Sequence, residues 1–205
     1  MVIGVLATEV SYAELTQLNP AMHWKRIGHP KELTKELAID AFFDLSENAG
    51  ENISDVPTGI PVFINSVCHT LHEKKLPNDM VRINGWCGFI NRPVWEVAGT
   101  LTEAHLNVLS TIGIKATPTP DEPGLIAARI LSMIINEAYF AKEEQVSTEA
   151  EIDIAMKLGT NYPKGPFEWA KAIGLPHIVS LLDKLSETDP RYTPASLLRK
   201  EANEA

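Results

Sequence analysis

Cysteine is scarce in this chain of 205 residues, which has only Cys68 and Cys87. Two thiols make no disulfide framework, and they do not fall into the paired spacing that holds zinc. We therefore expect both to be reduced and largely buried. The six histidines are isolated from one another and show no paired ligand spacing, so the sequence predicts no metal site.

Long apolar runs and basic stretches are also absent. No run approaches the ~20 residues of a membrane-spanning helix, so we expect no membrane insertion. The first ten residues lack a basic region and meet Glu9 too early for a signal peptide, which predicts a cytoplasmic protein. The net charge of −9, with no Lys/Arg-rich stretch, argues against a nucleic-acid partner. For the same reason, an anionic CoA or dinucleotide would need local donors.

The first half of the chain alternates short apolar runs with polar segments that suit helices. This alternation predicts an α/β layer with a mostly parallel sheet. Gly113 is expected to stop the last helix of this half, whose inner face carries Leu106, Leu109 and Ile112. The expected strands are 2–7, 22–27, 39–45, 61–67, 81–86 and 114–117, and the expected helices are 11–18, 30–37 and 103–113.

The composition and the hydrophobic pattern of the sequence change at Thr117. Residues 117–124 read TPTPDEPG, which is rich in Pro and Gly, has no hydrophobic periodicity, and marks a domain boundary. We therefore expect a truncated Rossmann-like α/β domain over residues 1–118 and an all-helical domain over residues 119–205.

The second half is expected to be wholly helical. The helix 125–142 is apolar on most sides, which suggests burial between subunits as well as within one. Thr148 and Glu151 form a capping-box pattern, and Gly159 is expected to end that helix. Pro166, Pro176 and Pro194 are each expected to open a further helix, with Gly174 closing the first of the three.

Residues 151–175 contain the run NYPKGPF between two helical segments, and residues 121–131 read DEPGLIAARIL. Both stretches closely resemble the 3-hydroxyacyl-CoA dehydrogenase family. The resemblance extends weakly upstream to about Ile60, through the strand 62–67 and the segment 85–97. It implies an amino-terminal dinucleotide-binding domain and a carboxy-terminal domain that mediates homodimer formation.

The family resemblance also implies chemistry: hydride transfer between NAD and the 3-hydroxyl or 3-keto carbon of an acyl-CoA. A His acts as general base, a Glu orients it, and a Ser and an Asn bind the substrate oxygen or the cofactor. Asn65 and the turn residues are expected on the substrate side. These turn residues are Tyr162, Pro163, Gly165, Pro166 and Phe167.

Several of the family's catalytic positions hold other residues. Cys87 stands where the base is expected, and a thiol replaces an imidazole poorly at neutral pH. Glu96 matches the orienting Glu in its local motif, at a shorter spacing from Cys87. It is a remnant, a carboxylate that pairs with another donor, or a carboxylate bonded to backbone or facing water.

The Ser and Asn positions are altered as well. Val67 occupies the Ser position unless a gap moves Ser66 there, and Ala128 occupies the Asn position. His69, one residue beyond the strand, is a candidate substitute base; the alternative is an exposed or helix-capping histidine.

The cofactor fingerprint is missing too. A dinucleotide site needs Gly-x-Gly-x-x-Gly after the first strand, so that the backbone can approach the pyrophosphate. Here Gly4 is followed by Leu6 and Glu9 at the other two positions, and we expect no NAD site. The sequence predicts a diverged family member without NAD-dependent catalysis that binds an acyl-CoA-like molecule or a partner. The alternative is an active NAD-dependent enzyme.

Overall fold

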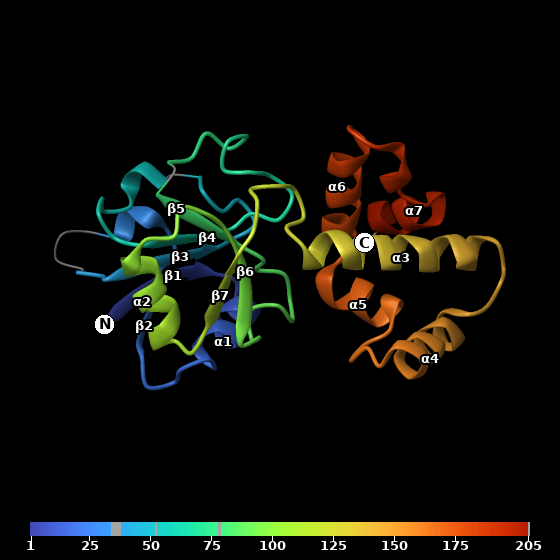
Figure 1. Cartoon of the computed structure of the whole chain (residues 1–205), viewed down its shortest axis with the longest axis horizontal. Coiled ribbons are helices and arrows are strands. Elements are labelled where there is room, and N and C mark those ends of the chain that lie inside the picture. Colours follow the sequence, from blue (N-terminus) through green and yellow to red (C-terminus); the bar gives the residue numbers. More distant parts are fainter. Residues whose placement is uncertain (34–37, 52, 78, 205) are drawn as a thin grey trace. The chain divides into compact units, whose positions relative to one another are not determined.

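The computed structural model describes residues 1–33, 38–51, 53–77 and 79–204. The chain forms two compact units, Met1–Leu125 and Ile126–Ala205 (Figure 1). This division and the predicted boundary at residue 118 both fall at or after the end of the last strand and before the long helix of the second unit. No helix in the described part of the chain is long and apolar enough to cross a membrane.

The first unit is built on a seven-stranded sheet in the order β2-β1-β3-β4-β5-β6-β7. The first five strands are parallel, β6 runs antiparallel to β5, and β7 is parallel to β6. The mostly parallel sheet predicted from the sequence is confirmed. The strands are β1 (Val2–Ala7), β2 (His23–Arg26), β3 (Ala41–Leu45), β4 (Val62–Asn65), β5 (Met80–Ile83), β6 (Val94–Gly99) and β7 (Lys115–Pro118).

Both α-helices of this unit contribute to one apolar cluster on one face of the sheet. Leu15 of α1 (Glu9–Thr16) and Leu109 of α2 (Glu103–Thr111) belong to the same cluster as Val5, Phe43 and Phe63. Alternate residues point the other way, because successive side chains of a strand face opposite sides. The second cluster contains Phe42, Val62 and Ile64 and is covered by connecting segments.

The connections differ from the helices that we predicted. Only α1 forms a crossover helix of more than one turn between the described parallel strands, and it begins two residues earlier than expected. The predicted helix 30–37 is a 3-10 turn, η1 (Pro30–Glu32), and residues 34–37 of the prediction lie outside the described residues. A second 3-10 turn, η2 (Ile53–Asp55), follows β3. The strand β6 is absent from our sequence predictions.

The inner face of α2 also differs from the prediction. Leu106 is 40% exposed, and His105 is buried beside Leu109 and Ile112. The His105 ring is packed edge-on against Phe63.

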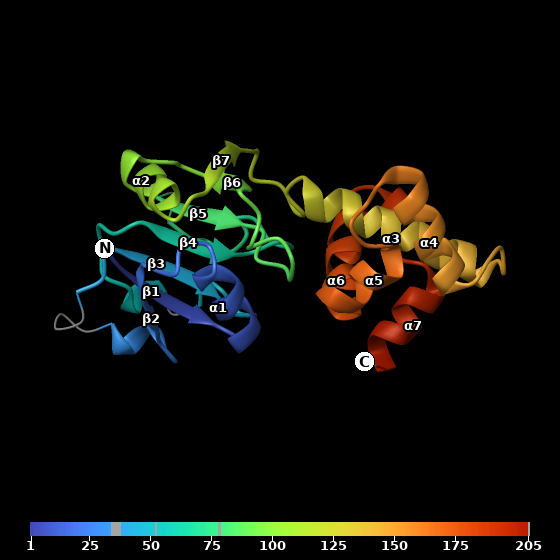
Figure 2. The same cartoon turned by 90° about the horizontal axis from the view of Figure 1, so that it is seen from below.

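The second unit is helical throughout its described length apart from connections, as predicted (Figure 2). Asn136 is 1% exposed and links two distant segments, since its side chain donates to the Thr193 carbonyl and accepts from the Ala195 amide at 2.8 Å. The helices are α3 (Ala127–Glu143), α4 (Glu149–Thr160), α5 (Pro166–Ile173), α6 (Leu175–Ser186) and α7 (Ser196–Glu204), with the 3-10 turn η3 (Pro190–Tyr192).

Two helix ends lie elsewhere than the sequence suggested. Gly159 is inside α4, and Asn161 takes the left-handed conformation that ends the helix, with φ of 56°. Asn tolerates this region because its short polar side chain bonds locally. The long helix begins at Ala127, since Leu125 has a φ of 49° and cannot be part of a right-handed helix. The Thr148–Glu151 capping box is confirmed.

Candidate functional site

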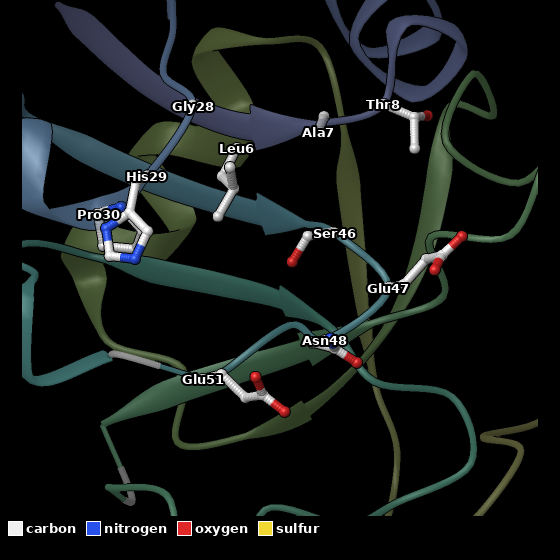
Figure 3. Close-up of a pocket in the computed structure, with 10 residues that line it drawn as sticks. All are labelled: Leu6, Ala7, Thr8, Gly28, His29, Pro30, Ser46, Glu47, Asn48 and Glu51. Atoms are coloured by element: carbon white, nitrogen blue, oxygen red, sulfur yellow. The ribbon is translucent and has the colours of Figure 1, made fainter.

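A pocket of about 430 Å³ lies at the carboxyl ends of β1, β2 and β3. The strand order reverses between β1 and β3, because β2 pairs with one edge of β1 and β3 with the other. Ligands of open α/β sheets bind in this type of crevice. Figure 3 shows the three lining segments: Leu6, Ala7 and Thr8, then Gly28, His29 and Pro30, then Ser46, Glu47, Asn48 and Glu51.

Asp44 of β3 holds the third lining segment by hydrogen bonds. It is 1% exposed, and its carboxylate accepts bonds from the Ser46 amide, the Ser46 hydroxyl at 2.6 Å and the Gly50 amide at 2.9 Å. Moving a loop away from a buried carboxylate costs free energy, because the carboxylate then loses hydrogen-bond donors that no water replaces. The loop 46–51 is therefore fixed, with Glu47 and Glu51 exposed on the pocket side.

The charge of the pocket is negative. Two carboxylates, Glu47 and Glu51, are among its described lining residues, which include neither Lys nor Arg. Arg26 is a nearby cation, and its guanidinium donates to the Ala7 carbonyl at 3.3 Å. The first turn of α1 carries Glu9, and the Thr8 hydroxyl already accepts from the Ser11 amide.

A second polar cluster lies at the ends of β4 and β5. The Asn65 side chain accepts from the Gly85 amide at 3.0 Å, and the Asn84 side chain donates to Glu96 of β6 at 3.4 Å. A Cβ at Gly85 would lie 2.6 Å from Cγ of Asn65, so only glycine permits this approach. The structure thus connects two predicted site residues, Asn65 and Glu96, through the Asn84-Gly85 pair.

Cys87 bonds to a different partner. Its Sγ is 3.5 Å from Oε1 of Glu14, on α1, and the Gly88 amide donates to the same carboxylate. Glu96, the carboxylate predicted to accompany Cys87, accepts a hydrogen bond from the Asn84 side chain.

Ser66 and His69 lie in the loop after β4. The Ser66 hydroxyl, which is buried, donates to the His69 carbonyl at 2.7 Å, so it has a structural partner. The His69 side chain is 52% exposed and its Nδ1 is 3.9 Å from Glu73. Thr70 and Glu73 exchange hydrogen bonds around the following turn.

The turn between α4 and α5 is organised by Asp153, which is 8% exposed. Its two oxygens accept from the Phe167 amide at 2.8 Å and the Glu168 amide at 3.2 Å, which caps the amino end of α5 from a neighbouring helix. A Cβ at Gly165 would lie 2.2 Å from Oδ1 of Asp153. Phe167 is buried against Tyr139, whereas Tyr162 is 40% exposed. Gly165 and Phe167 thus have structural roles within this unit.

The carboxy-terminal unit is similar to known proteins. Residues 124–205 match the family described as 3-hydroxyacyl-CoA dehydrogenase, C-terminal domain. The 3-hydroxyadipyl-CoA dehydrogenase of Escherichia coli is 45% identical over 84 residues, which are 40% of this chain and 18% of that protein. The 3-hydroxybutyryl-CoA dehydrogenase of Bradyrhizobium diazoefficiens is 39% identical over 100 residues, 48% of this chain and 34% of that protein.

The carboxy-terminal unit is thus similar to the C-terminal domain of 3-hydroxyacyl-CoA dehydrogenases.

Solved structures of low sequence identity have a similar fold. The structure of M. tuberculosis FadB2 has a TM-score of 0.78 at 15% identity and covers 99% of this chain and 93% of that one. The (S)-3-hydroxybutyryl-CoA dehydrogenase PaaH1 from Ralstonia eutropha has a TM-score of 0.74 at 19% identity, with the same coverage. At such low identity these likenesses show the fold alone. The sequence matches to the two curated relatives span about a third or less of their length.

The resemblance to this dehydrogenase family implies the cofactor NAD. The pocket at the carboxyl ends of β1, β2 and β3 does not fit this cofactor. A pyrophosphate must approach the backbone after β1 and meet free amides at the amino end of α1. Leu6 places a side chain in this approach, as Figure 3 shows. Glu9, Glu47 and Glu51 add negative charge around it. Among the described residues, the sheet has one strand, β2, outside β1, whereas a full dinucleotide half has two.

Several residues of these clusters escaped the sequence analysis. Arg82, which donates to the Ser66 carbonyl, left a visible signal, since it is a lone charge in the apolar strand MVRI. Asp44 left a similar one in the buried strand AFFDL. Glu14 and Asn84 left none, because their partners come from elements far away in the sequence. The described residues contain no group of three or more His, Cys, Asp or Glu side chains that could hold a metal ion.

Proposed function

We propose that this protein is a diverged member of its family that lacks NAD-dependent catalysis and binds an acyl-CoA-like molecule or a related protein subunit. The observation that carries this proposal is the pocket at the carboxyl ends of β1, β2 and β3. Leu6 and two carboxylates line it, whereas a pyrophosphate needs a close approach to glycine backbone and hydrogen-bond donors. A dinucleotide that binds poorly cannot present its nicotinamide to a substrate.

The residues at the catalytic positions support the same proposal. Cys87 replaces the base, and its thiol contacts the Glu14 carboxylate. Ala128 is buried in α3 at the position of the family's Asn and has no side-chain donor. Removing a general base alone lowers a rate by about 10²–10⁴.

The test is turnover of acetoacetyl-CoA with NADH, followed by loss of NADH absorbance, beside an active family member at equal concentration. We expect a rate at least about 10³-fold below that of the active enzyme. Comparable turnover in the two samples would overturn the proposal.

The second candidate function is that of an active NAD-dependent 3-hydroxyacyl-CoA dehydrogenase of fatty-acid metabolism. The names of the relatives favour it. It requires a replacement base, for which the exposed His69 is a candidate, and a different approach for NAD. Thermal shifts with NAD and with CoA, measured separately, discriminate: stabilisation by sub-millimolar NAD supports the enzyme, and stabilisation by CoA alone supports the ligand-binding protein.

We further propose that the helical unit forms a homodimer. The sequence analysis assigned the interface to the long helix α3, but Leu131, Ile135 and Tyr139 of that helix are buried within its own unit. The helix α4 exposes Ile154 by 53% and Leu158 by 83%, whereas α3 exposes Ile130 by 55%.

These two residues and Ala150 are spaced by four and therefore form one stripe on α4. A second copy of the chain would cover it. Sedimentation of Leu158→Glu tests this surface, with Asn203→Glu on α7 as the matched control. We expect the first variant to be monomeric and the second to behave as wild type. A dimer that survives Leu158→Glu would exclude this stripe. Met133→Glu is the corresponding test of α3.

A further inference from the structure

The amino end of α2 is closed by a histidine where a capping box ordinarily carries Glu or Gln. The Thr102 hydroxyl accepts from the His105 amide at 3.4 Å, and Nδ1 of His105 accepts from the Thr102 amide at 3.3 Å. The two side chains also meet directly, with 2.7 Å between Nδ1 and the hydroxyl oxygen. Nδ1 can accept the amide bond only when it carries no proton.

The imidazole is enclosed by the sheet. His105 is 3% exposed, and its ring stands edge-on to Phe63 of β4 with 5.3 Å between centroids. With Nδ1 as the acceptor, the proton of the neutral ring is on Nε2. This nitrogen is buried and has no hydrogen-bond partner of normal geometry among the described residues.

The surroundings of the ring favour its neutral form. Burial lowers the pKa of His105 below its ordinary value and outweighs the negative charge of Asp79, just before β5, which favours protonation. β4 contributes Phe63, and α2 itself contributes Glu103 in its first turn. The positive end of the helix dipole also disfavours a charged imidazole at this position.

We propose that His105 is an acid-sensitive cap that holds α2 on the sheet at neutral pH and releases its first turns in acid. Protonation puts a hydrogen on Nδ1, which then faces the Thr102 amide donor to donor and has only the Thr102 hydroxyl left to accept from it. The same step places a positive charge in an apolar site next to Phe63. Opening of the first turns lets water solvate the charged ring, so the open form gains population as the pH falls.

The direction of the pH effect on α2 follows from the protonation equilibria of the ring in the open and the closed form. The ring in the open form titrates near the ordinary value of 6.5, and the ring in the closed form titrates lower. The open form therefore binds more protons below about pH 6.5, and the protection of α2 is complete above that pH and decreases below it.

Hydrogen exchange of the segment 103–112 tests the proposal, with rates corrected for the intrinsic effect of pH. Between pH 7.5 and 5.5 we expect α2 to exchange about tenfold faster, which corresponds to the loss of one cap. The His105→Gln variant keeps an amide oxygen for Thr102 and cannot take up a proton, so its corrected rates should not change. His23→Gln, at an exposed strand position, is the matched control and should respond like wild type.

Equal pH dependence in wild type and His105→Gln would overturn the proposal, as would corrected wild-type rates that do not change with pH. A second measurement needs no variant. The ring carbon of His105, followed by NMR in the wild-type protein, should titrate below 6.5, and a midpoint at or above 6.5 would contradict the assignment.

Discussion

The guanidinium of Arg82 forms an ion pair with Asp121, which joins the fifth strand of the sheet to the segment that ends the first unit. The Arg82 side chain is 0% exposed and that of Asp121 is 29% exposed. Arg82 also donates to the Ser66 carbonyl at 2.7 Å and to the Val67 and Glu122 carbonyls at 3.3 Å. Burial lowers the pKa of Arg82, and Asp121 opposes that shift.

The first prediction concerns this pair. Asp121→Asn leaves the Arg82 charge buried without a counter-charge and should lower the free energy of unfolding of the first unit by about 3–5 kcal/mol. Arg82→Met should also be destabilising, and the double variant should lose less than the sum of the two single losses. Urea denaturation of the four proteins measures this coupling.

The surface pair Arg191–Asp189 is the control, with side chains 66% and 42% exposed. Asp189→Asn should cost under about 1 kcal/mol. Additive losses at Arg82 and Asp121 would show that the two residues stabilise the unit independently.

The second prediction uses two glycines of the helical unit. Gly165→Ala should destabilise the unit by at least about 1 kcal/mol, because the new Cβ would meet the Asp153 carboxylate and displace the cap of α5. Gly159→Ala should instead stabilise by about 0.5–1 kcal/mol, since Gly159 lies inside α4 with nothing within 4 Å of a new Cβ. Thermal unfolding of both variants checks the opposite signs, and equal shifts would contradict the assigned contact.

The third prediction concerns the cluster that ties α7 to α3. Tyr139 and Lys142 both donate to Glu201, at 2.8 and 2.7 Å. Burial favours the protonated carboxyl, but these two bonds outweigh it and lower the pKa of Glu201 below its ordinary 4.5. Because the folded pKa is depressed, the stabilisation is present above about pH 4.5 and is lost as the pH falls below it.

Glu201→Gln should therefore weaken the dependence of stability on pH below 4.5, by on the order of 1 kcal/mol or less, because Glu201 is partly exposed. Chemical denaturation at a series of pH values measures this change. The matched control is Glu204→Gln at the end of α7, which should behave as wild type. If Glu201→Gln leaves the dependence of stability on pH unchanged, Glu201 does not contribute to that dependence.

The fourth prediction tests the close contact between the ends of β4 and β5. Gly85→Ala should be destabilising, because its Cβ would lie 2.6–2.8 Å from the Asn65 side chain. Asn65→Gly removes these side-chain atoms, so the double variant should recover part of the stability lost by Gly85→Ala. A double variant no more stable than Gly85→Ala would place the strain elsewhere.

The sequence predicted most of the secondary structure where the signal was local. The Thr148–Glu151 capping box and the prolines that open α5 and α6 are local signals, and each correctly marked a helix. The errors fell where two local signals competed. Gly159 was chosen as a helix end over Asn161, although glycine inside a helix costs only about 1 kcal/mol.

The sequence could not place the polar clusters, because their members come from distant parts of the chain. Asn65 was named as a candidate, but its contact with Gly85 depends on the pairing of β4 with β5. Cys87 was paired with Glu96 by family position, whereas the structure brings it to Glu14 of α1, seventy-three positions away.

The sequence by itself determined the helical unit, its similarity to a known C-terminal domain and the absence of the glycine fingerprint, because these depend on residues adjacent in the chain. Only the tertiary structure decided that Leu6 and the loop 46–51 share one pocket, that His105 is buried, and that Arg82 anchors Asp121. Such facts depend on which strands pair and which faces are covered, and burial then sets the strength of every charge and hydrogen bond in these clusters.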